Sequence, residues 1–386
     1  MAKALILDAV RTAVGRGAGK DRALKDWRPD DLLAHVLKDL VFERTKIDPL
    51  QVEDVVTGCV TQTGEQGMNI ARLAALAAGL PVDLPGVSLN RMCGSGLQAA
   101  NFAAQGVMSG MQDLVIAGGV ENMSRVAMMS DAAEVGQSII SSYHIVPQGI
   151  SAELISEKWG FSRQQLDQFS LESHQKAAKA TKSGNFVKEI VPIPVKNNGG
   201  DKVMFKEDQG IRYDTTMEKL AALKPAFKPD GGVITAGNSS QISDGAAALL
   251  IASEKKADEL GKRPRARFVS MALAAVDPTI MLTAPMPASQ KALKKAGLTI
   301  SEMDVIEINE AFAPIPLAFI HDMRADPKKI NPNGGAIALG HPLGCSGAKL
   351  LITALNELER TKGHYGLITL CIGFGQGIAT VIERLN

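Results

Sequence analysis

Cys93 is the residue of this chain whose surroundings best suit nucleophilic chemistry. The apolar stretch 87–90 before it predicts a strand, and the small-residue stretch 97–108 after it predicts a helix. A thiol at such a junction lies beside the free N–H groups and partial positive charge of a helix N-terminus, which favours the thiolate. Gly94 and Gly96 would let a substrate approach the backbone closely. Packing of Cys93 in a hydrophobic core is the alternative that this local pattern leaves open.

Two polar residues in distant parts of the chain could act on such a thiol or its substrate. His341 lies within the glycine-rich run 333–347, where it could serve as a base or as a hydrogen-bond donor to an oxyanion. Asn309 follows the predicted strand 305–308 and could orient a substrate through its amide. Capping of a helix over 311–319 is the structural alternative for Asn309, and both roles can coexist.

A second candidate thiol, Cys371, ends the predicted strand 366–370. The glycine-rich run 372–377 that follows resembles a dinucleotide fingerprint, but that fingerprint requires a helix after the glycines. Residues 378–382 are instead rich in β-branched side chains and predict another strand. The glycines are therefore expected to form a tight turn between two strands, whose backbone N–H groups could bind an anion.

Alternating strands and helices at both ends of the chain must position these residues. Strands are predicted over 3–8, 53–58, 87–90 and 113–118, and helices over 29–40, 68–78 and 97–108. Residues 121–245 are more polar and carry turn signals at 197–200 and 228–232, so they predict an inserted region. Alternation resumes at Ala246 and continues to the end, which predicts a mixed sheet with helices on its faces.

The two alternating parts resemble each other. Three stretches recur in the same order at an offset of roughly 250 residues: 53–56 resembles 303–306, 93–96 resembles 345–348, and 113–116 resembles 365–368. Three ordered matches at a near-constant offset predict a duplicated α/β unit with the polar region inserted between the copies. Two related halves commonly pack face to face and place a site at their junction.

Composition and charge exclude several classes of function. Hydrophobic residues make up 45% and charged residues 22% of the 386, which is ordinary for a globular protein, and the formal charge of +1 gives no general attraction to nucleic acid or anionic lipid. The four cysteines form no CxxC pair, so neither a zinc site nor a redox dithiol is expected. No signal peptide or membrane-spanning stretch is recognisable, and we expect a cytoplasmic protein.

Taken together, these motifs resemble those of the thiolases, the acetyl-CoA acyltransferases. The resemblance covers essentially the whole chain in order, and several separate motifs at similar spacing make it specific. The matching stretches are 90–96, 235–238 with Ser240, 244–245, 309–313, 340–344 and 371–373.

The resemblance implies an α/β fold of two similar βαβαβαββ halves, which form a layered α/β/α/β/α structure with a loop domain inserted in the first half. In this chain the N-terminal half would comprise residues 1–120 and 246–268, and the C-terminal half residues 269–386. Residues 121–245 would form the inserted loop domain, a lid that binds coenzyme A.

The resemblance also implies a role for each candidate residue. Cys93 would carry the acyl group, His341 would activate it, and Cys371 would act as general acid and base at the α-carbon of the substrate. Asn309, through a water molecule, and His341 would line one oxyanion hole, and the backbone N–H groups of Cys93 and Gly373 would form a second. Coenzyme A would be a substrate rather than a bound cofactor, no metal is implied, and the positions expected to contact coenzyme A are Arg212, Phe227, Ala236, Ser240 and Phe312.

The implied reaction is the cleavage of a 3-ketoacyl-CoA by CoA to acetyl-CoA and a shortened acyl-CoA, with ping-pong kinetics through an acyl group on Cys93. The enolate left when the C2–C3 bond breaks needs a stabilised oxygen and prompt protonation, and a thiolate is both a nucleophile and a leaving group. A biosynthetic acetoacetyl-CoA thiolase is the alternative, and an inactive CoA-binding scaffold is a remote one.

Two departures from the family pattern concern the length of the acyl chain that the substrate carries. Thiolases specialised for acetoacetyl-CoA carry a His-Met pair where this chain has Pro-Gln-Gly at 147–149, and some relatives have glycine in place of Phe374. Both changes lie where the acyl chain is expected, which favours a degradative thiolase of broader or longer chain range, as in fatty-acid β-oxidation. A homo-oligomer, either a dimer or the tetramer usual in the family, is expected, without nucleic acid or integral membrane association.

Overall fold

The computed structural model describes residues 2–132, 134–197 and 199–385 of the chain. Two sets of strands make up its main sheet, and they meet where β1 (Ala4–Thr12) pairs antiparallel with β10 (Ala266–Ala275). The first set has the order β4-β3-β5-β9-β1, and the second has the order β11-β12-β13-β10. The other strands of these sets are β3 (Asp54–Gly58), β4 (Gly86–Leu89), β5 (Leu114–Asn122), β9 (Ser243–Ser253), β11 (Val305–Ile308), β12 (Tyr365–Ile372) and β13 (Gln376–Arg384).

The two sets of strands repeat one topology. In the first set β3 runs parallel to β4 and β5, and β5 pairs antiparallel with β9. In the second set β11 runs parallel to β12, and β12 pairs antiparallel with β13. The counterpart of β4 in the second set is reduced to an isolated bridge between Ile306 and Ile330. The duplicated α/β unit predicted from the sequence repeats is therefore confirmed, with one strand shortened in the second copy.

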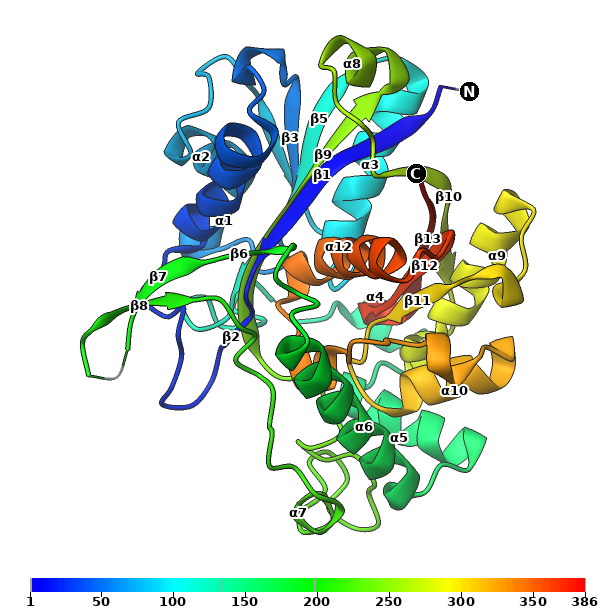
Figure 1. Ribbon diagram of the computed structural model, residues 1–386. Coiled ribbons are helices and arrows are strands. Elements are labelled where there is room, and N and C mark those ends of the chain that lie inside the picture. Colours follow the sequence, from blue (N-terminus) through cyan, green and yellow to red (C-terminus); the bar gives the residue numbers. More distant parts are fainter. Residues whose placement is uncertain (1, 133, 198, 386) are drawn as a thin grey trace.

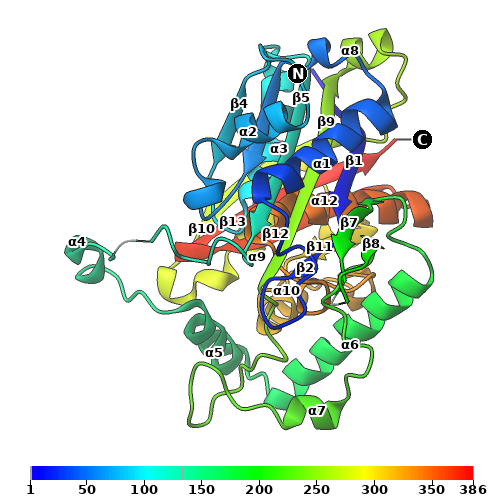
Figure 2. The ribbon, with the colours of Figure 1, turned by 90° about the vertical axis from the view of Figure 1, so that its left-hand side faces the viewer.

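Helices separate and cover the two sets of strands, which gives five layers (Figures 1 and 2). Two helices pack together between the two sets, α3 (Ser95–Ser109) and α12 (Leu343–Thr361). Helices α1 (Pro29–Lys38) and α2 (Ile70–Ala77) cover the outer face of the first set, and α9 (Pro285–Ala296) and α10 (Pro314–Met323) cover that of the second. This is the predicted α/β/α/β/α arrangement.

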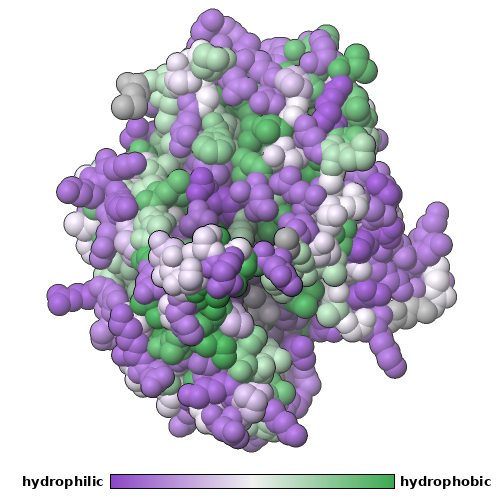
Figure 3. Space-filling view, turned by 180° about the vertical axis from the view of Figure 1, so that it is seen from behind, coloured by the Kyte–Doolittle hydropathy of each residue, from purple (hydrophilic) through white to green (hydrophobic). Residues whose placement is uncertain are grey.

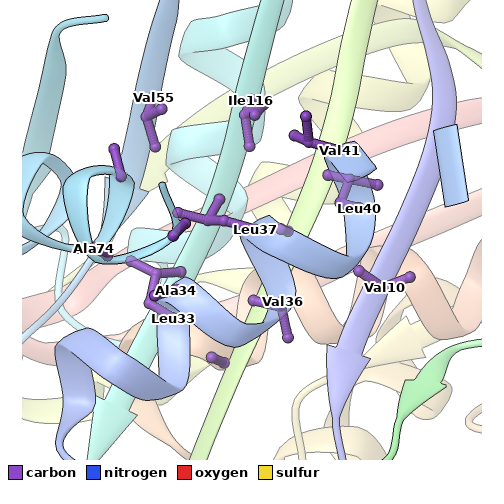
Figure 4. Close-up of a cluster of buried hydrophobic side chains, with 14 of the residues drawn as sticks. Val10, Leu33, Ala34, Val36, Leu37, Leu40, Val41, Val55, Ala74 and Ile116 are labelled. Atoms are coloured by element: carbon purple, nitrogen blue, oxygen red, sulfur yellow. The ribbon is translucent and has the colours of Figure 1, made fainter. Parts of the chain in front are cut away.

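The outermost helix of the first half, α1, shows how the sequence specifies these layers. Its first residue is Pro29, which suits the first helical turn, and two aspartates follow it at the positive end of the helix dipole. Leu33 and Leu37, one turn apart, are buried and lie with Val55 of β3 and Ile116 of β5 in one hydrophobic cluster (Figure 4). Burying each such side chain contributes about 1.5–3 kcal/mol, so the apolar face of the helix fixes its place on the sheet.

The two central helices touch backbone to backbone at their first turns. A Cβ atom on Gly96 of α3 would lie 2.6 Å from the carbonyl oxygen of Gly344, and one on Gly347 of α12 would lie 2.3 Å from the backbone nitrogen of Leu97. No side chain larger than hydrogen fits at either position. Because the first turns are so close, the loops that precede them, which carry Cys93 and His341, are brought to the same place.

The polar region between β5 and β9 contains the remaining larger elements. Its helices are α4 (Gln137–Ile140), α5 (Gln148–Trp159), α6 (Arg163–Lys182) and α7 (Met217–Ala221), and β7 (Ile193–Lys196) pairs with β8 (Lys202–Phe205) in a small separate sheet. Helix α4 stands away from the body of the molecule in Figure 2. The structure also contains three short elements, namely β2 (Gly15–Arg16), β6 (Ile190–Val191) and α8 (Glu254–Glu259). The division into halves and a loop domain stays a prediction, and its limits at residues 120, 245 and 268 lie within β5, β9 and β10.

None of the helices in the described part of the chain is both long enough and apolar enough to cross a membrane.

Candidate active site

Cys93 lies in a tight turn between β4 and α3. Met92 before it has a left-handed backbone conformation, with φ of 44°. The hydroxyl of Ser95 closes the turn, since it donates to the carbonyl oxygen of Met92 (2.6 Å) and accepts from the N–H of Arg91 (2.9 Å). Cys93 is buried and packs against Leu343, in the first turn of α12. The strand-to-helix junction predicted for Cys93 is therefore present, and it faces the second half of the molecule.

Three groups act to lower the pKa of the Cys93 thiol. They are its own backbone N–H, the N–H of Gly373 and the side-chain amide of Gln148. Burial outweighs them, and with a smaller contribution from the Glu121 carboxylate it raises the pKa of Cys93 to about 11. The sequence-based expectation that the helix N-terminus would favour a thiolate was therefore wrong, because burial has the larger effect on the pKa. Removal of the thiol from water dominates, and Cys93 is a neutral thiol near pH 7.

The second thiol, Cys371, faces the first. Burial is the main cause that raises the pKa of Cys371 above its usual value, and the nearby sulfur of Cys93 raises it further. Cys371 lies in β12, which continues through the turn Gly373–Gly375 into the antiparallel strand β13. The predicted strand–turn–strand arrangement is thus confirmed. It brings the backbone N–H of Gly373 to Cys93, while Cys371 remains a proton-bearing thiol beside it.

The hydrogen bonds around His341 assign its tautomer. Nδ1 lies 2.5 Å from the hydroxyl of Ser346, and that hydroxyl donates its only proton to the carbonyl oxygen of Pro342 (2.8 Å). Nδ1 must therefore carry the hydrogen, which leaves the lone pair on Nε2. Burial, with a smaller effect of the positive charge of Lys349, lowers the pKa of His341 to about 4. The imidazole is neutral at pH 7, and the lone pair through which it can act as a base lies on Nε2.

Asn309 acts on His341 rather than as a helix cap. Its Nδ2 lies 3.3 Å from Nε2 of His341, and its backbone N–H donates to the carbonyl oxygen of Thr369. Helix α10 begins only at Pro314, so capping, the structural alternative, does not apply. Oδ1 of Asn309 is buried and has no hydrogen-bond partner among the described residues. This oxygen is the one available to hold a water molecule or a polar group of a substrate.

Two buried carboxylates, which the sequence analysis did not assign to the site, hold its loops. Glu310 accepts hydrogen bonds from the hydroxyl of Ser173 (2.7 Å) in α6, from the amide of Asn331 (2.8 Å) and from the N–H of Ile337 (3.2 Å) in α11 (Ala336–Leu339). It therefore joins the inserted region to the loop that carries His341. The signal available in the sequence was the Asn-Glu pair at a strand end, of which only the asparagine was interpreted.

The other carboxylate, Glu121 at the end of β5, joins the loop that follows β3 to the first turn of α12. It accepts from the backbone N–H groups of Val60 (3.0 Å), Thr61 (3.1 Å) and Gly344 (2.9 Å). Burial raises the pKa of Glu121, and these donors oppose that shift. Because Gly344 lies in the first turn of α12, Glu121 fixes the start of that helix next to the strands of the first half.

The positions predicted to contact coenzyme A are only partly brought together. Phe227 and Phe312 stack edge to face, with ring centroids 5.8 Å apart, and the N–H of Ser240 donates to the carbonyl oxygen of Ala311 (2.9 Å). Arg212 and Ala236 are exposed, and no side-chain contact with Cys93, His341 or Cys371 is recorded for them in the described part of the chain. Binding of coenzyme A by these five positions stays a prediction.

Gln148 and Gly149 are two further residues near the site to which the sequence assigned no catalytic role. The amide nitrogen of Gln148 lies 3.6 Å from the place where a Cβ atom on Gly373 would stand. Gly149 allows the ring of Phe227 to lie against α5, since a Cβ atom on Gly149 would be 2.2 Å from that ring. The available signal was the departure from the family pattern at 147–149. Within the described residues no group of three or more His, Cys, Asp or Glu side chains could hold a metal ion.

Comparison with known proteins agrees with this geometry. Residues 4–255 match the family model of the thiolase N-terminal domain, and residues 262–384 match that of the thiolase C-terminal domain. The chain is 48% identical to a 3-ketoacyl-CoA thiolase of Enterobacter sp. (strain 638) over 389 residues, which covers 100% of both chains. It is 46% identical to the steroid 3-ketoacyl-CoA thiolase FadA6 of Mycobacterium tuberculosis, covering 100% of this chain and 95% of that protein.

Among solved structures, the Bacillus anthracis acetyl-CoA acetyltransferase superposes with a TM-score of 0.91 at 38% identity, covering 100% of this chain and 99% of that one. The similarity therefore extends over the full length of the chain and includes both halves. The chain belongs to the thiolase family of acyltransferases.

Proposed function

We propose that this enzyme cleaves 3-ketoacyl-CoA with CoA to give acetyl-CoA and an acyl-CoA shortened by two carbons, through an acyl group on Cys93. The observation that carries the proposal is the convergence of four groups from both halves. The N–H of Gly373 and the thiol of Cys371 act on the sulfur of Cys93. Cys93 packs against Leu343, two positions after His341, which Asn309 contacts. Relatives that match the full chain at 46–48% identity are named 3-ketoacyl-CoA thiolases.

In the first half-reaction the sulfur of Cys93 attacks C3 of the substrate, and its proton passes to Nε2 of His341. Burial disfavours a free thiolate at Cys93, and it equally disfavours a free imidazolium at His341. Proton transfer and attack therefore proceed together, so that the negative charge moves onto the carbonyl oxygen. The N–H groups of Cys93 and Gly373, which lie at the sulfur, stabilise that oxygen.

Breakage of the C2–C3 bond leaves its electron pair on C2 as the enolate of acetyl-CoA. We assign stabilisation of the enolate oxygen to His341 and to a group held by Asn309, whose Oδ1 is free to accept. Cys371 then donates its proton to C2, which completes acetyl-CoA. Because the pKa of Cys371 is raised, this thiol keeps its proton until a strongly basic carbon forms.

In the second half-reaction the Cys371 thiolate takes the proton of an incoming CoA thiol. The CoA sulfur attacks the acyl carbonyl, the Cys93 sulfur leaves, and it recovers its proton from His341. No atom or electron is left over, and no metal is required. Phe227, Phe312, Ser240, Ala236 and Arg212 are the residues that we propose contact coenzyme A.

Two measurements test this function. Incubation with a 3-ketoacyl-CoA in the absence of CoA should release acetyl-CoA and add the mass of the shortened acyl group to the peptide containing Cys93. The Cys93→Ala variant should form no adduct and retain no thiolysis. Full activity of Cys93→Ala, or an adduct on another cysteine, would show that the proposed nucleophile is wrong.

A biosynthetic acetoacetyl-CoA thiolase is the second candidate, because the similar B. anthracis structure is named an acetyl-CoA acetyltransferase. We favour degradation of longer chains for two reasons. This chain has Pro-Gln-Gly at 147–149 where acetoacetyl-CoA thiolases carry a His-Met pair, and it has Phe374 where some relatives have glycine. Thiolysis rates for acetoacetyl-CoA and for a long-chain 3-ketoacyl-CoA should decide between them. A rate for the long chain that is at least comparable supports the degradative enzyme, and activity confined to acetoacetyl-CoA supports the other. A protein that binds CoA but turns over neither substrate would be the inactive scaffold.

We further propose that the enzyme is a homo-oligomer in the cytoplasm. Strand β4 lies at the edge of the sheet, and among the described strands its one recorded neighbour is β3. Val87 on β4 is 45% exposed, so this edge is open to pairing with a second copy of the chain. Ile140, the last residue of the projecting α4, is 53% exposed, and Figure 3 shows hydrophobic atoms among polar ones on the rear face. The four cysteines are unpaired, which fits a reducing compartment. Light scattering after size exclusion would measure the number of copies.

A further inference from the structure

Two turns from opposite halves of the molecule lie against each other at the nucleophile. The turn 90–94 contains Cys93 and begins α3, and the turn 373–375 joins β12 to β13. Met92 of the first turn packs on the second, since a Cβ atom on Gly373 would lie 2.6 Å from the sulfur of Met92. Apolar packing has no preferred direction, so this contact brings the turns together without fixing how one lies on the other.

A hydrogen bond between side chains joins the same two turns. Nη1 of Arg91 donates to Oε1 of Gln376 across 3.0 Å, although the two residues are 285 positions apart in the chain. Both residues are half-buried. A hydrogen bond, unlike a packing contact, has a preferred distance and direction. It therefore restricts how the turn with Cys93 lies on the turn with Gly373.

The backbone on each side of this hydrogen bond is itself held. The N–H of Arg91 donates to the hydroxyl of Ser95 (2.9 Å), and its carbonyl oxygen accepts from the N–H of Gly94 (3.0 Å). Gln376 is the first residue of β13, where it pairs with Ile372 of β12 and lies between β12 and β10. Because neither backbone is loose, a shift of one turn would have to stretch or break the bond.

We propose that Arg91 and Gln376 are positioning residues, whose hydrogen bond places the N–H of Gly373 against the carbonyl oxygen of the group that reacts at Cys93. The inference deepens the proposed function and rests on it for the reaction concerned. A preorganised N–H group stabilises an oxyanion over a narrow range of distance and angle, so a displaced turn stabilises it less. Neither side chain touches the substrate in this role, and each acts through the backbone that it holds.

A role in stability alone is the alternative, because a hydrogen bond between the halves also contributes to folding. That role would lower the melting temperature of a variant and leave kcat and the reactivity of Cys93 unchanged. The positioning role changes both, since the N–H of Gly373 also lowers the pKa of the Cys93 thiol. A direct effect of the positive charge of Arg91 is a further alternative, and replacement of Gln376 separates it, because the charge then remains.

The experiment compares Arg91→Met, which removes the donor, with Gln376→Met, which removes the acceptor, and with the double variant. Arg267→Met is the matched control, because it breaks the pair with Glu383 at the other end of β13. Acylation of Cys93 by a 3-ketoacyl-CoA without CoA is followed in single turnovers, and steady-state kinetics give kcat and the KM for CoA. The rate of alkylation of Cys93 by iodoacetamide is measured as a function of pH, with mass spectrometry of the Cys93 peptide.

We expect each single variant to lower the acylation rate and kcat about tenfold, less than the loss of an oxyanion-hole donor costs, while the KM for CoA stays within about twofold. Alkylation at neutral pH should slow several-fold, because less of the thiol ionises once the N–H of Gly373 has moved. The double variant should lose no more than the worse single variant, since all three break one bond. Arg267→Met should keep the rates of the unmodified enzyme.

The proposal is overturned if Arg91→Met and Gln376→Met keep the acylation rate and the alkylation profile of the unmodified enzyme, or if their losses multiply in the double variant. A loss in Arg91→Met alone would also overturn it, since the charge would then be responsible. If neither variant folds, Arg91→Lys, a donor of shorter reach, should give a smaller loss in the same direction, and no loss would refute the role. Alkylation needs no 3-ketoacyl substrate, so failure of this inference and failure of the proposed thiolysis can be told apart.

Discussion

The side-chain amide of Asn309 donates to Nε2 of His341 across 3.3 Å, although the two residues lie in different loops 32 positions apart in the chain. Ser346 accepts from the opposite nitrogen of the same ring, so the imidazole is held from both sides in one tautomer. The pairing also leaves Oδ1 of Asn309 free to accept a hydrogen bond in a buried place. Asn309 therefore both orients the base and offers the site one uncommitted acceptor.

Replacement of Asn309 should impair catalysis more than binding. We expect Asn309→Ala to lower kcat by roughly 100-fold, at the lower end of what the loss of one oxyanion-hole group costs, because both the orientation of His341 and the group held by Oδ1 are lost. The KM for CoA should change little. Steady-state thiolysis of one 3-ketoacyl-CoA at varied CoA measures both constants. A change confined to KM would contradict this role, and Asn185→Ala, where an amide contacts Asn333 away from the thiols, is the control.

Two buried histidines should make the protein less stable in mild acid. Burial lowers the pKa of His341 to about 4 and that of His174 to about 4, below their usual value of 6.5. Between pH 6.5 and 4 the unfolded chain therefore binds more protons than the folded one, so stability falls as the pH falls through this window. Each histidine contributes a slope of at most about 1.4 kcal/mol per pH unit.

The variant His174→Asn isolates one of these contributions. His174 accepts a hydrogen bond from the N–H of Arg212 through Nδ1, and the asparagine side chain also offers an acceptor. We expect the free energy of unfolding of the variant, measured with urea at a series of pH values, to fall less steeply than that of the unmodified protein from pH 6.5 to 4. Above pH 6.5 the two curves should run parallel. Parallel curves over the whole range would show that His174 does not titrate in this way.

A single methyl group at Gly149 should disturb the binding of CoA. The Cβ atom of Gly149→Ala would lie 2.2 Å from the ring of Phe227, so the ring must move and its edge-to-face contact with Phe312 must change. We expect the KM for CoA to rise several-fold, on the order of 1 kcal/mol of lost contact, with a smaller effect on kcat. Gly136→Ala is the matched control, because its Cβ atom meets nothing closer than 3.9 Å. Equal behaviour of the two variants would rule out this role of Phe227.

Breaking the buried ion pair between β1 and the inserted region should destabilise the fold. Arg11 is fully buried and binds Asp208 through two hydrogen bonds of 2.7 and 2.9 Å, with Glu189 as a second partner at 2.7 Å. Removal of one charge leaves the guanidinium in the interior without its main partner, so Asp208→Asn should cost about 3–5 kcal/mol. Denaturant unfolding at neutral pH measures this cost. In Glu254→Gln, which breaks the exposed pair with Lys3, we expect a loss of at most about 1 kcal/mol.

The sequence by itself determined the local settings of the chemistry. A strand that gives way to a small-residue helix was enough to place Cys93 at a helix N-terminus, and β-branched residues after the glycines near Cys371 were enough to predict a turn between strands. These features depend on neighbours a few positions away, since backbone preference and hydrophobic periodicity act over short distances. The repeated stretches extended the same reasoning to two similar halves.

Only the tertiary structure decided how the local pieces act on one another. The pKa of Cys93 is set by burial, which removed the thiolate expected from the helix dipole, and burial depends on residues of both halves. The pairing of Asn309 with His341 and the approach of Gln148 to Gly373 likewise depend on chain segments that meet only after folding. Desolvation and hydrogen bonding act between atoms that are close in space, so no pattern along the chain could supply them.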